Sequence, residues 1–234
     1  MSFIDLIIVL VIKYINGNTT ILNMKITWFG HASFLIEADG KNIYIDPYMI
    51  EEYGKKADII LVSHGHYDHY SREKITQLRM DSTEIFSTPE VAGRVDGTKA
   101  VKPGDKEESQ GIKIEVVEAY SVTRTTHPKG TAVGFIIEAE KHRVYFSGDT
   151  DLIPEMSKIK ADIALLPVSG TYVMNYREAV EAVKKIKPRI AIPMHYGAGI
   201  AGTIEDAEGF KEQVEFETDT IVEILKEGKE FEIK

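Results

Sequence analysis

The 234-residue sequence contains no cysteine, only three glutamines and a single tryptophan. Without cysteine the chain can form no disulfide, thiolate zinc site, iron–sulfur cluster or thiol nucleophile. Any metal must therefore be held by histidine, carboxylate, carbonyl or water ligands. Basic residues are also in deficit, with 28 Lys and Arg against 37 Asp and Glu, a formal charge of −9. This balance disfavours a broad nucleic-acid-binding face, so nucleic acid is not an expected partner.

The chain also lacks an apolar run that is long enough to span a bilayer. Residues 3–12, FIDLIIVLVI, are about half of the roughly 20 residues required, and Asp5 interrupts them. No basic residue precedes this run and no small-residue cleavage site follows it, so a signal peptide is not expected here. We expect residues 1–23 to be an N-terminal extension, with Met24 as the native start and no stable membrane insertion. The alternatives are an extra packing element or a weak membrane anchor.

The remaining composition is ordinary for a folded protein, with 43% apolar and 28% charged residues. We expect residues 24–234 to form one domain. Few amides, no cysteine and abundant Lys and Glu are typical of a thermophile's cytoplasmic protein.

Predicted strands and helices alternate along this domain, which favours an α/β fold with mixed sheets. Strands are predicted at 25–29, 33–38, 42–45, 58–62, 112–117, 132–139, 143–147, 163–167, 190–194 and 221–225. The Asp39-Gly40 pair predicts a hairpin between the second and third of these. Helices are predicted from Ser71 to Leu78, from Asn175 to Pro188 and from Thr203 onward.

One motif predicts a metal site. His64-Gly65-His66-Tyr67-Asp68-His69 places three imidazoles and a carboxylate in six residues, directly after a continuous apolar run. Such crowding at a buried strand end would be unfavourable unless a cation held the groups together. In extended backbone His64 and His66 point to the same side and can bind one metal, while Asp68 and His69 can reach a second.

The His-x-His-x-Asp-His motif resembles that of the metallo-β-lactamase superfamily. The resemblance implies a four-layer αββα sandwich with two mixed β-sheets and a two-metal site. It further implies ligands at His127, in Thr126-His127-Pro128, at Asp149, in Gly148-Asp149-Thr150, and at His195, in Met194-His195-Tyr196. The implied assignment is His64, His66 and His127 to metal one, Asp68, His69 and His195 to metal two, and Asp149 as the bridge. Two divalent ions are expected, with zinc first and manganese or iron as alternatives.

The segment Trp28-Phe29-Gly30-His31-Ala32-Ser33-Phe34 resembles one branch of these hydrolases, related to ascorbate-6-phosphate lactonase and to N-acyl-phosphatidylethanolamine phospholipase D. That resemblance makes His31 a candidate catalytic residue near the metals; the alternative is a turn histidine. It also implies that Asp46 steadies the metal loop through hydrogen bonds.

His142 and Asp151 are expected to have structural roles and not to bind metal. His142 is expected to be a solvated turn residue. Asp151 is expected to cap the helix that follows it.

The family pattern implies a hydrolase in which a metal-bridging hydroxide, oriented by Asp68, cleaves a small ester, lactone or phosphodiester. The expected partner is a small-molecule substrate, and the protein could form a homo-oligomer. An RNase Z-like nuclease is an alternative, disfavoured by the acidic balance and the lack of a basic arm. A non-catalytic metal-binding scaffold is another, disfavoured because every expected ligand is present.

Overall fold

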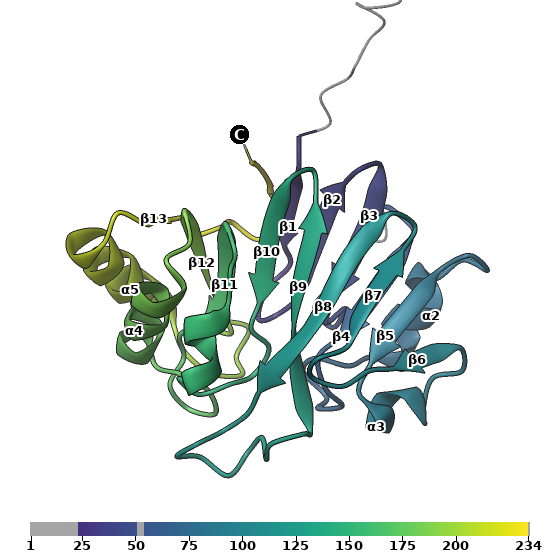
Figure 1. The fold of residues 1–234 in the computed structure, drawn as a ribbon, viewed down its shortest axis with the longest axis horizontal. Helices are drawn as coiled ribbons and strands as arrows, with labels where there is room; N and C mark the ends of the chain where they lie inside the picture. The colour runs from purple at the N-terminus through teal and green to yellow at the C-terminus, as the bar shows by residue number, and fades with distance from the viewer. Residues whose placement is uncertain (1–22, 51–53, 234) are drawn as a thin grey trace, which may run out of the picture.

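The computed structural model describes residues 23–50 and 54–233, and the expected N-terminal extension lies outside them except for its last residue. Two seven-stranded β-sheets pack face to face, and helices cover their outer faces (Figure 1). This architecture confirms the expected four-layer α/β sandwich with two mixed sheets.

The first sheet has the strand order β14-β1-β2-β3-β4-β5-β6. Its strands are β1 (Lys25–Trp28), β2 (Phe34–Ala38), β3 (Lys41–Ile45), β4 (Ile59–Val62), β5 (Glu84–Ser87), β6 (Thr98–Ala100) and β14 (Glu230–Glu232). Strands β14, β1, β2 and β3 pair antiparallel, and β3 to β6 pair parallel. The predicted hairpin between β2 and β3 is confirmed: Ala38 pairs with Lys41, and Asp39 and Gly40 both have positive φ.

The second sheet has the order β13-β12-β11-β10-β9-β8-β7. Its strands are β7 (Lys106–Ser109), β8 (Ile112–Ala119), β9 (Ala132–Ala139), β10 (His142–Phe146), β11 (Ile163–Pro167), β12 (Ile190–Met194) and β13 (Ile221–Val222). Strands β7 to β10 pair antiparallel, whereas β10 to β13 pair parallel.

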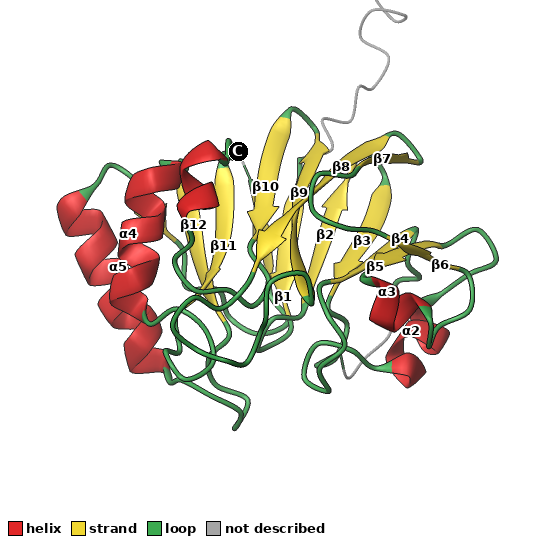
Figure 2. Ribbon diagram, turned by 60° about the horizontal axis from the view of Figure 1, so that its bottom comes forward, coloured by secondary structure: helices red, strands yellow, loops and turns green. Residues whose placement is uncertain are grey.

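The helices lie on the two outer faces, as Figure 2 shows in red. They are α2 (Arg72–Leu78), α3 (Pro89–Ala92), α4 (Tyr176–Ile186), α5 (Ile204–Glu217) and a 3-10 helix, η1 (Pro154–Lys158). The predicted helix start at Asn175 is confirmed, and a capping box forms there: the Asn175 side chain accepts from the Glu178 N–H, and the Glu178 carboxylate accepts from the Asn175 N–H. Among the residues of the described ranges, no helix has the length and apolarity needed to cross a membrane.

Apolar side chains from both sheets fill the space between them. Phe34 of β2 and Phe146 of β10, for example, meet edge to face with ring centroids 6.2 Å apart. A second cluster, which includes Ile75, Leu78 and Val91, packs α2 and α3 against the outer face of the first sheet. Burial on both faces explains the continuous apolar runs of β4 and β11.

Some elements differ from the sequence predictions. Strands β5, β6, β7 and β14 and helix α3 were not predicted, because each spans at most four residues and shows too little periodicity. The helix expected after Asp151 is present as η1. His142 is the half-buried first residue of β10 and not a turn residue, because it pairs with Ala139 of β9.

The arrangement of strands gathers several loops at one end of the sandwich, where they come forward in Figure 2. The carboxyl ends of β3, β4, β10, β11 and β12 all lead into these loops. The Val133 N–H of β9 donates a 3.0 Å hydrogen bond to the carbonyl of Ser63, which follows β4, and so joins the two sheets here. Strand ends of this kind are where α/β proteins present ligand-binding groups.

Candidate metal centre

The histidine-rich motif begins where β4 ends. The backbone turns tightly after His66, whose carbonyl accepts hydrogen bonds from the N–H groups of His69 (3.1 Å) and Tyr70 (2.9 Å). This turn brings Asp68 and His69 back toward the strand end that carries His64. Of the motif's three histidines and one aspartate, three side chains are buried, and His66 is exposed.

The second sheet supplies the other three predicted ligands. His127 lies in the loop between β8 and β9, Asp149 follows β10, and His195 follows β12. Gly148 sets the position of Asp149: its φ is +62°, and a Cβ there would lie 2.6 Å from the Val133 carbonyl oxygen. Only glycine fits this approach between the sheets without strain.

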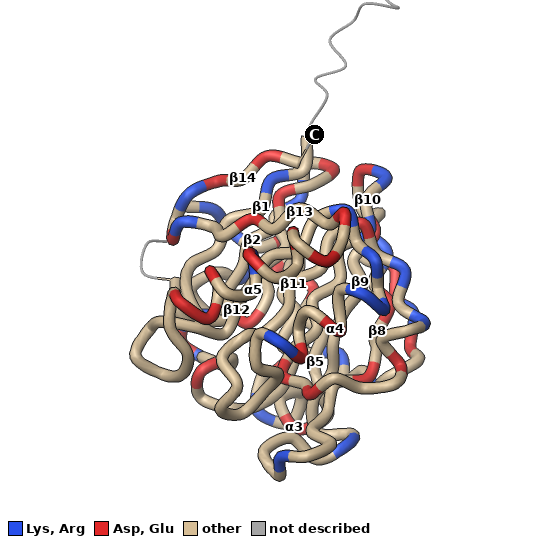
Figure 3. Tube along the Cα trace, turned by 90° about the vertical axis from the view of Figure 1, so that its left-hand side faces the viewer, with Lys and Arg blue, Asp and Glu red and all other residues tan. Residues whose placement is uncertain are grey.

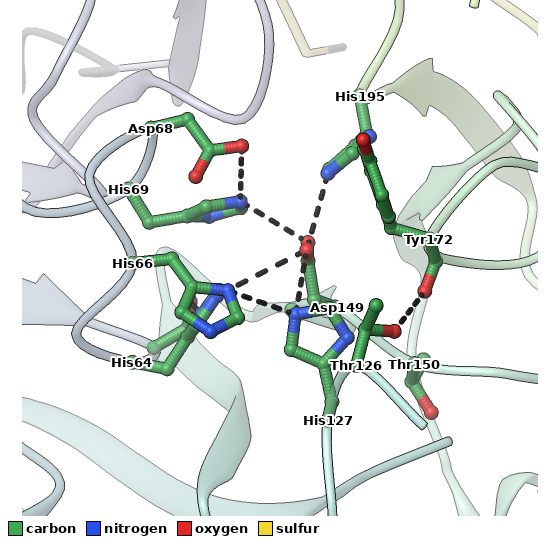
Figure 4. Close-up of polar contacts among 12 residues, drawn as sticks. His64, His66, Asp68, His69, Thr126, His127, Asp149, Thr150, Tyr172 and His195 are labelled. Atoms are coloured by element: carbon green, nitrogen blue, oxygen red, sulfur yellow. Dashed lines mark hydrogen bonds and ion pairs between the residues drawn. The ribbon is translucent and has the colours of Figure 1, made fainter. Parts of the chain in front are cut away.

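The predicted ligands converge on the Asp149 carboxylate, as Figure 4 shows. Its oxygens lie near the Nε2 atoms of His195 (3.1 Å), His127 (3.2 Å), His69 (3.3 Å) and His64 (4.0 Å). His66 joins the cluster through its Nδ1 atom, which lies 3.2 Å from His127 Nε2. Asp68 Oδ2 lies 3.8 Å from His69 Nε2. The structure thus brings together all seven residues predicted from the sequence.

These donors fit metal ions. Their ligand atoms form three groups, each within a 4.8 Å span: His64, His66 and His127; His64, His69 and Asp149; and His31, Asp68, His69 and His195. The Nε2 atom of His64 is buried without a hydrogen-bond partner, and His69 Nε2 and Asp149 Oδ1 have no neighbour of that kind except each other, at 3.3 Å. Buried polar atoms are rarely left unsatisfied, so these three atoms indicate a place for a cation.

A hydrogen bond to the opposite ring nitrogen orients each of three histidines. Ser63 Oγ lies 2.9 Å from His64 Nδ1, and Ser169 Oγ lies 3.1 Å from His195 Nδ1. Asp46 Oδ2 lies 2.7 Å from His69 Nδ1. In each case Nε2 is the ring nitrogen that faces the centre, which is the arrangement found around metal-binding histidines.

Asp46 also holds the start of the metal loop. Its carboxylate accepts hydrogen bonds from the Ser63 N–H (2.7 Å) and the Ser63 hydroxyl (2.6 Å). The hydrogen bonds expected of Asp46 are therefore present, and one carboxylate links β3, the end of β4 and His69. Sequence reasoning did not identify Ser63 or Ser169 as a hydrogen-bond partner of a ligand histidine, since a lone serine after a strand carries no specific signal for that role.

At His64, His127 and Asp149 the surroundings favour the protonation states that metal binding requires. Burial lowers the pKa of His64 well below its ordinary value, and it also lowers that of His127. Burial opposes ionisation of Asp149, but the His195 and His69 rings beside it hold its pKa well below the usual range. Neutral imidazoles and an ionised carboxylate are the forms that bind metal.

His31 lies within the cluster and is fully buried. Its Nε2 atom is 3.1 Å from Asp68 Oδ2, and its ring centroid is 4.0 Å from that of His195. Burial lowers the pKa of His31 to about 4, so the ring is neutral near pH 7 and can donate its Nε2–H to Asp68. The backbone carbonyl of His31 accepts from the His195 N–H at 2.9 Å, which ties the first loop to the last.

A half-buried arginine organises the loop Tyr120–Thr131, which carries His127. Arg124 pairs with the carboxylates of Asp151 and Glu178 and donates to the Gly170 carbonyl. Asp151 also accepts from the backbone N–H groups of Val122 and Thr123, both at 2.8 Å. The expected capping role of Asp151 is therefore wrong: Ile153 holds the N-cap position of η1, and the carboxylate binds the opposite loop.

A small pocket of about 250 Å³ opens onto the centre. Its lining consists of His66, Tyr67, Asp68, Thr126, His127, Asp149 and Tyr172. The pocket therefore connects solvent with ligands of both predicted metal positions.

Comparisons with known proteins point to one family. The model of the beta-lactamase superfamily domain matches residues 25–195. A UPF0173 metal-dependent hydrolase of Methanopyrus kandleri is 34% identical over 89% of this chain and 100% of its own length. A UPF0173 metal-dependent hydrolase of Methanosarcina mazei is 33% identical over 90% of this chain and 99% of its own length.

A solved structure agrees with these sequence matches. Igni18, described as a metallo hydrolase from the hyperthermophilic archaeon Ignicoccus hospitalis, superimposes with a TM-score of 0.76 at 27% identity. The match covers 91% of this chain and all of the Igni18 chain.

Proposed function

The chain belongs to the metallo-β-lactamase superfamily and is a metal-dependent hydrolase, and we propose that it uses two metal ions to cleave a small ester, lactone or phosphodiester. The observation that carries this proposal is the convergence of four histidine Nε2 atoms on the Asp149 carboxylate, at 3.1–4.0 Å. A single carboxylate approached from both sides by imidazoles is suited to bridge two cations.

The proposed ligands divide between the two positions. His64, His66 and His127 would hold one ion, Asp68, His69 and His195 would hold the other, and Asp149 would bridge them. Zinc suits sites whose ligands are histidine nitrogens and carboxylate oxygens, and manganese or iron could replace it. Two such ions would supply a hydroxide nucleophile near neutral pH and polarise the bond under attack.

Asp68 and His31 form the proposed proton-handling pair. Asp68 lines the pocket, and its Oδ2 lies between His31 Nε2 at 3.1 Å and His69 Nε2 at 3.8 Å. With His31 donating to Oδ2, the carboxylate is held in one orientation. It can then orient the attacking water and accept its proton.

The substrate is proposed to be a small molecule and not a nucleic acid. The pocket volume of about 250 Å³ admits a small group only. Lys and Arg positions are interspersed with Asp and Glu positions on the side seen in Figure 3, so this side offers no continuous basic track. These observations favour a hydrolase of small molecules over the RNase Z-like nuclease.

Chelation and reconstitution test the proposal. Protein stripped with a chelator is reloaded with zinc, manganese or iron and assayed on phenyl acetate, a γ-lactone and bis(p-nitrophenyl) phosphate. We expect no hydrolysis by the stripped protein and restored hydrolysis of at least one substrate after reloading. His64→Ala and Asp149→Ala should abolish metal retention, whereas His142→Ala, a histidine outside the cluster, should not. Full hydrolysis by the stripped protein would contradict the proposal.

A further inference from the structure

The pocket in front of the candidate metal centre presents two aromatic side chains to solvent. Tyr67 is 70% exposed and Tyr172 is 43% exposed, and both line the pocket. Val122, in the neighbouring loop Tyr120–Thr131, is 59% exposed. Exposed aromatic side chains that line a pocket are available to contact a ligand bound there.

Neighbouring groups contact the Tyr67 ring and the Tyr172 backbone. The Tyr67 ring meets the Tyr48 ring edge to face, with centroids 6.3 Å apart and an interplanar angle of 84°. The carbonyl of Tyr172 accepts a 3.0 Å hydrogen bond from the Thr126 hydroxyl, and Figure 4 shows this contact beside the cluster. Contacts that order these residues before binding reduce the conformational freedom that is lost when a ligand binds.

The pocket lining provides no positive side chain for an anionic group. None of its seven residues, all within the described part of the chain, is lysine or arginine. The two cations of the loop Tyr120–Thr131 are already paired: Arg124 with Asp151 and Glu178, and Lys129 with Glu118 and Glu155. Apart from the proposed metal ions, this lining therefore offers a phosphate group none of the arginine or lysine side chains that usually bind it.

We propose that Tyr67 and Tyr172 form a subsite for an uncharged aromatic group, so that the enzyme prefers uncharged aryl esters or aromatic lactones to phosphodiesters. This inference rests on the proposed function and narrows its substrate class. For an aryl ester, the water oxygen bonds to the acyl carbon and the bond from that carbon to the aryl oxygen breaks. One proton of the water ends on the aryl oxygen, which gives a carboxylic acid and a phenol.

Kinetics on matched esters test the subsite. Metal-loaded wild-type protein, Tyr172→Ser and Tyr67→Ser are compared on phenyl acetate and methyl acetate. The control is Phe216→Ser, which removes an aromatic ring that is 89% exposed on α5 and outside the pocket lining. We expect each tyrosine variant to raise KM for phenyl acetate by roughly 5- to 10-fold with little change in kcat. KM for methyl acetate should stay unchanged in both tyrosine variants. Phe216→Ser should leave KM and kcat unchanged for both esters.

An unreactive probe provides a second readout that does not need turnover. Binding of acetanilide and N-methylacetamide to the metal-loaded protein is measured by NMR. Acetanilide should bind the wild type more tightly, and Tyr172→Ser should remove that preference while Tyr172→Phe retains it.

The outcomes separate this inference from the proposed function. Equal KM increases for the phenyl and methyl esters, or equal binding of the two amides, would overturn the aromatic subsite. A kcat/KM for diphenyl phosphate above that for phenyl acetate would also overturn it. Absence of all hydrolysis by metal-loaded wild-type protein would contradict the proposed function instead, and the amide binding would still decide the subsite.

Discussion

Asp46 Oδ2 lies 2.7 Å from Nδ1 of His69, although the two residues follow different strands of the first sheet. Both side chains are fully buried. The contact fixes the His69 ring so that Nε2 faces Asp149 at 3.3 Å. The hydrogen bond therefore connects the sheet framework with a proposed ligand of metal two.

Replacing this carboxylate should weaken metal binding without removing a ligand. Asp46→Asn keeps the size of the side chain but loses the charge that holds His69. We expect metal affinity to fall by about 10- to 100-fold. Competition with a chromophoric chelator measures this affinity, and exposed Asp81→Asn serves as the control. An unchanged affinity in Asp46→Asn would show that His69 needs no such partner.

Gly148 should tolerate no side chain. In Gly148→Ala the new Cβ would meet the Val133 carbonyl oxygen at 2.6 Å, whereas at Gly104, which also has positive φ, nothing lies within 4 Å. Both variants carry the backbone strain of alanine at positive φ. Gly148→Ala should lose about 1–3 kcal/mol more in free energy of unfolding than Gly104→Ala. Urea denaturation measures both, and equal losses would be inconsistent with the close approach.

Arg124 should stabilise the loop that carries His127. Arg124→Met removes the ion pairs with Asp151 and Glu178, and Asp151 is 3% exposed. We expect about 1–3 kcal/mol less stability and weaker binding of one metal equivalent. Arg94→Met, which breaks an exposed pair with Glu90, should change stability by no more than about 0.5 kcal/mol. If both variants behave alike, the Arg124 contacts do not order the loop.

His31 should affect the rate more than the metal content. His31→Gln alters the group that contacts Asp68 Oδ2 at 3.1 Å. We expect kcat to fall by about 100-fold or more while both metals are retained. Kinetics combined with metal analysis check this, with His142→Gln as the control. Loss of one metal equivalent would place His31 among the ligands instead of beside Asp68.

Much of the fold could be predicted because long patterned segments dominate it. Strands β9, β11 and β12 have the predicted bounds, and α4 starts at its predicted cap. Short edge elements such as β14 could not be predicted, because three residues carry no measurable periodicity. Their positions depend on pairing with distant strands, which the local sequence does not encode.

The positions of the candidate ligands were predictable because the motif places four of them within six residues. The other three follow from strand-end position together with the family resemblance. The supporting contacts were harder to predict. Arg124 and Asp151 are 27 residues apart, and nothing in either local sequence indicates that they pair. Ser169 was likewise recognisable only once its distance of 3.1 Å from His195 Nδ1 was known.

The central claim is that hydrolysis requires two metals bound at one Asp149-bridged centre. Titration of metal-stripped protein with zinc, while hydrolysis of phenyl acetate is followed, tests this claim most directly. The account predicts that the rate rises to a plateau at two zinc equivalents per chain and that Asp149→Asn shows no such rise. A rate that is independent of added zinc, or one that reaches its plateau with a single equivalent, would contradict it.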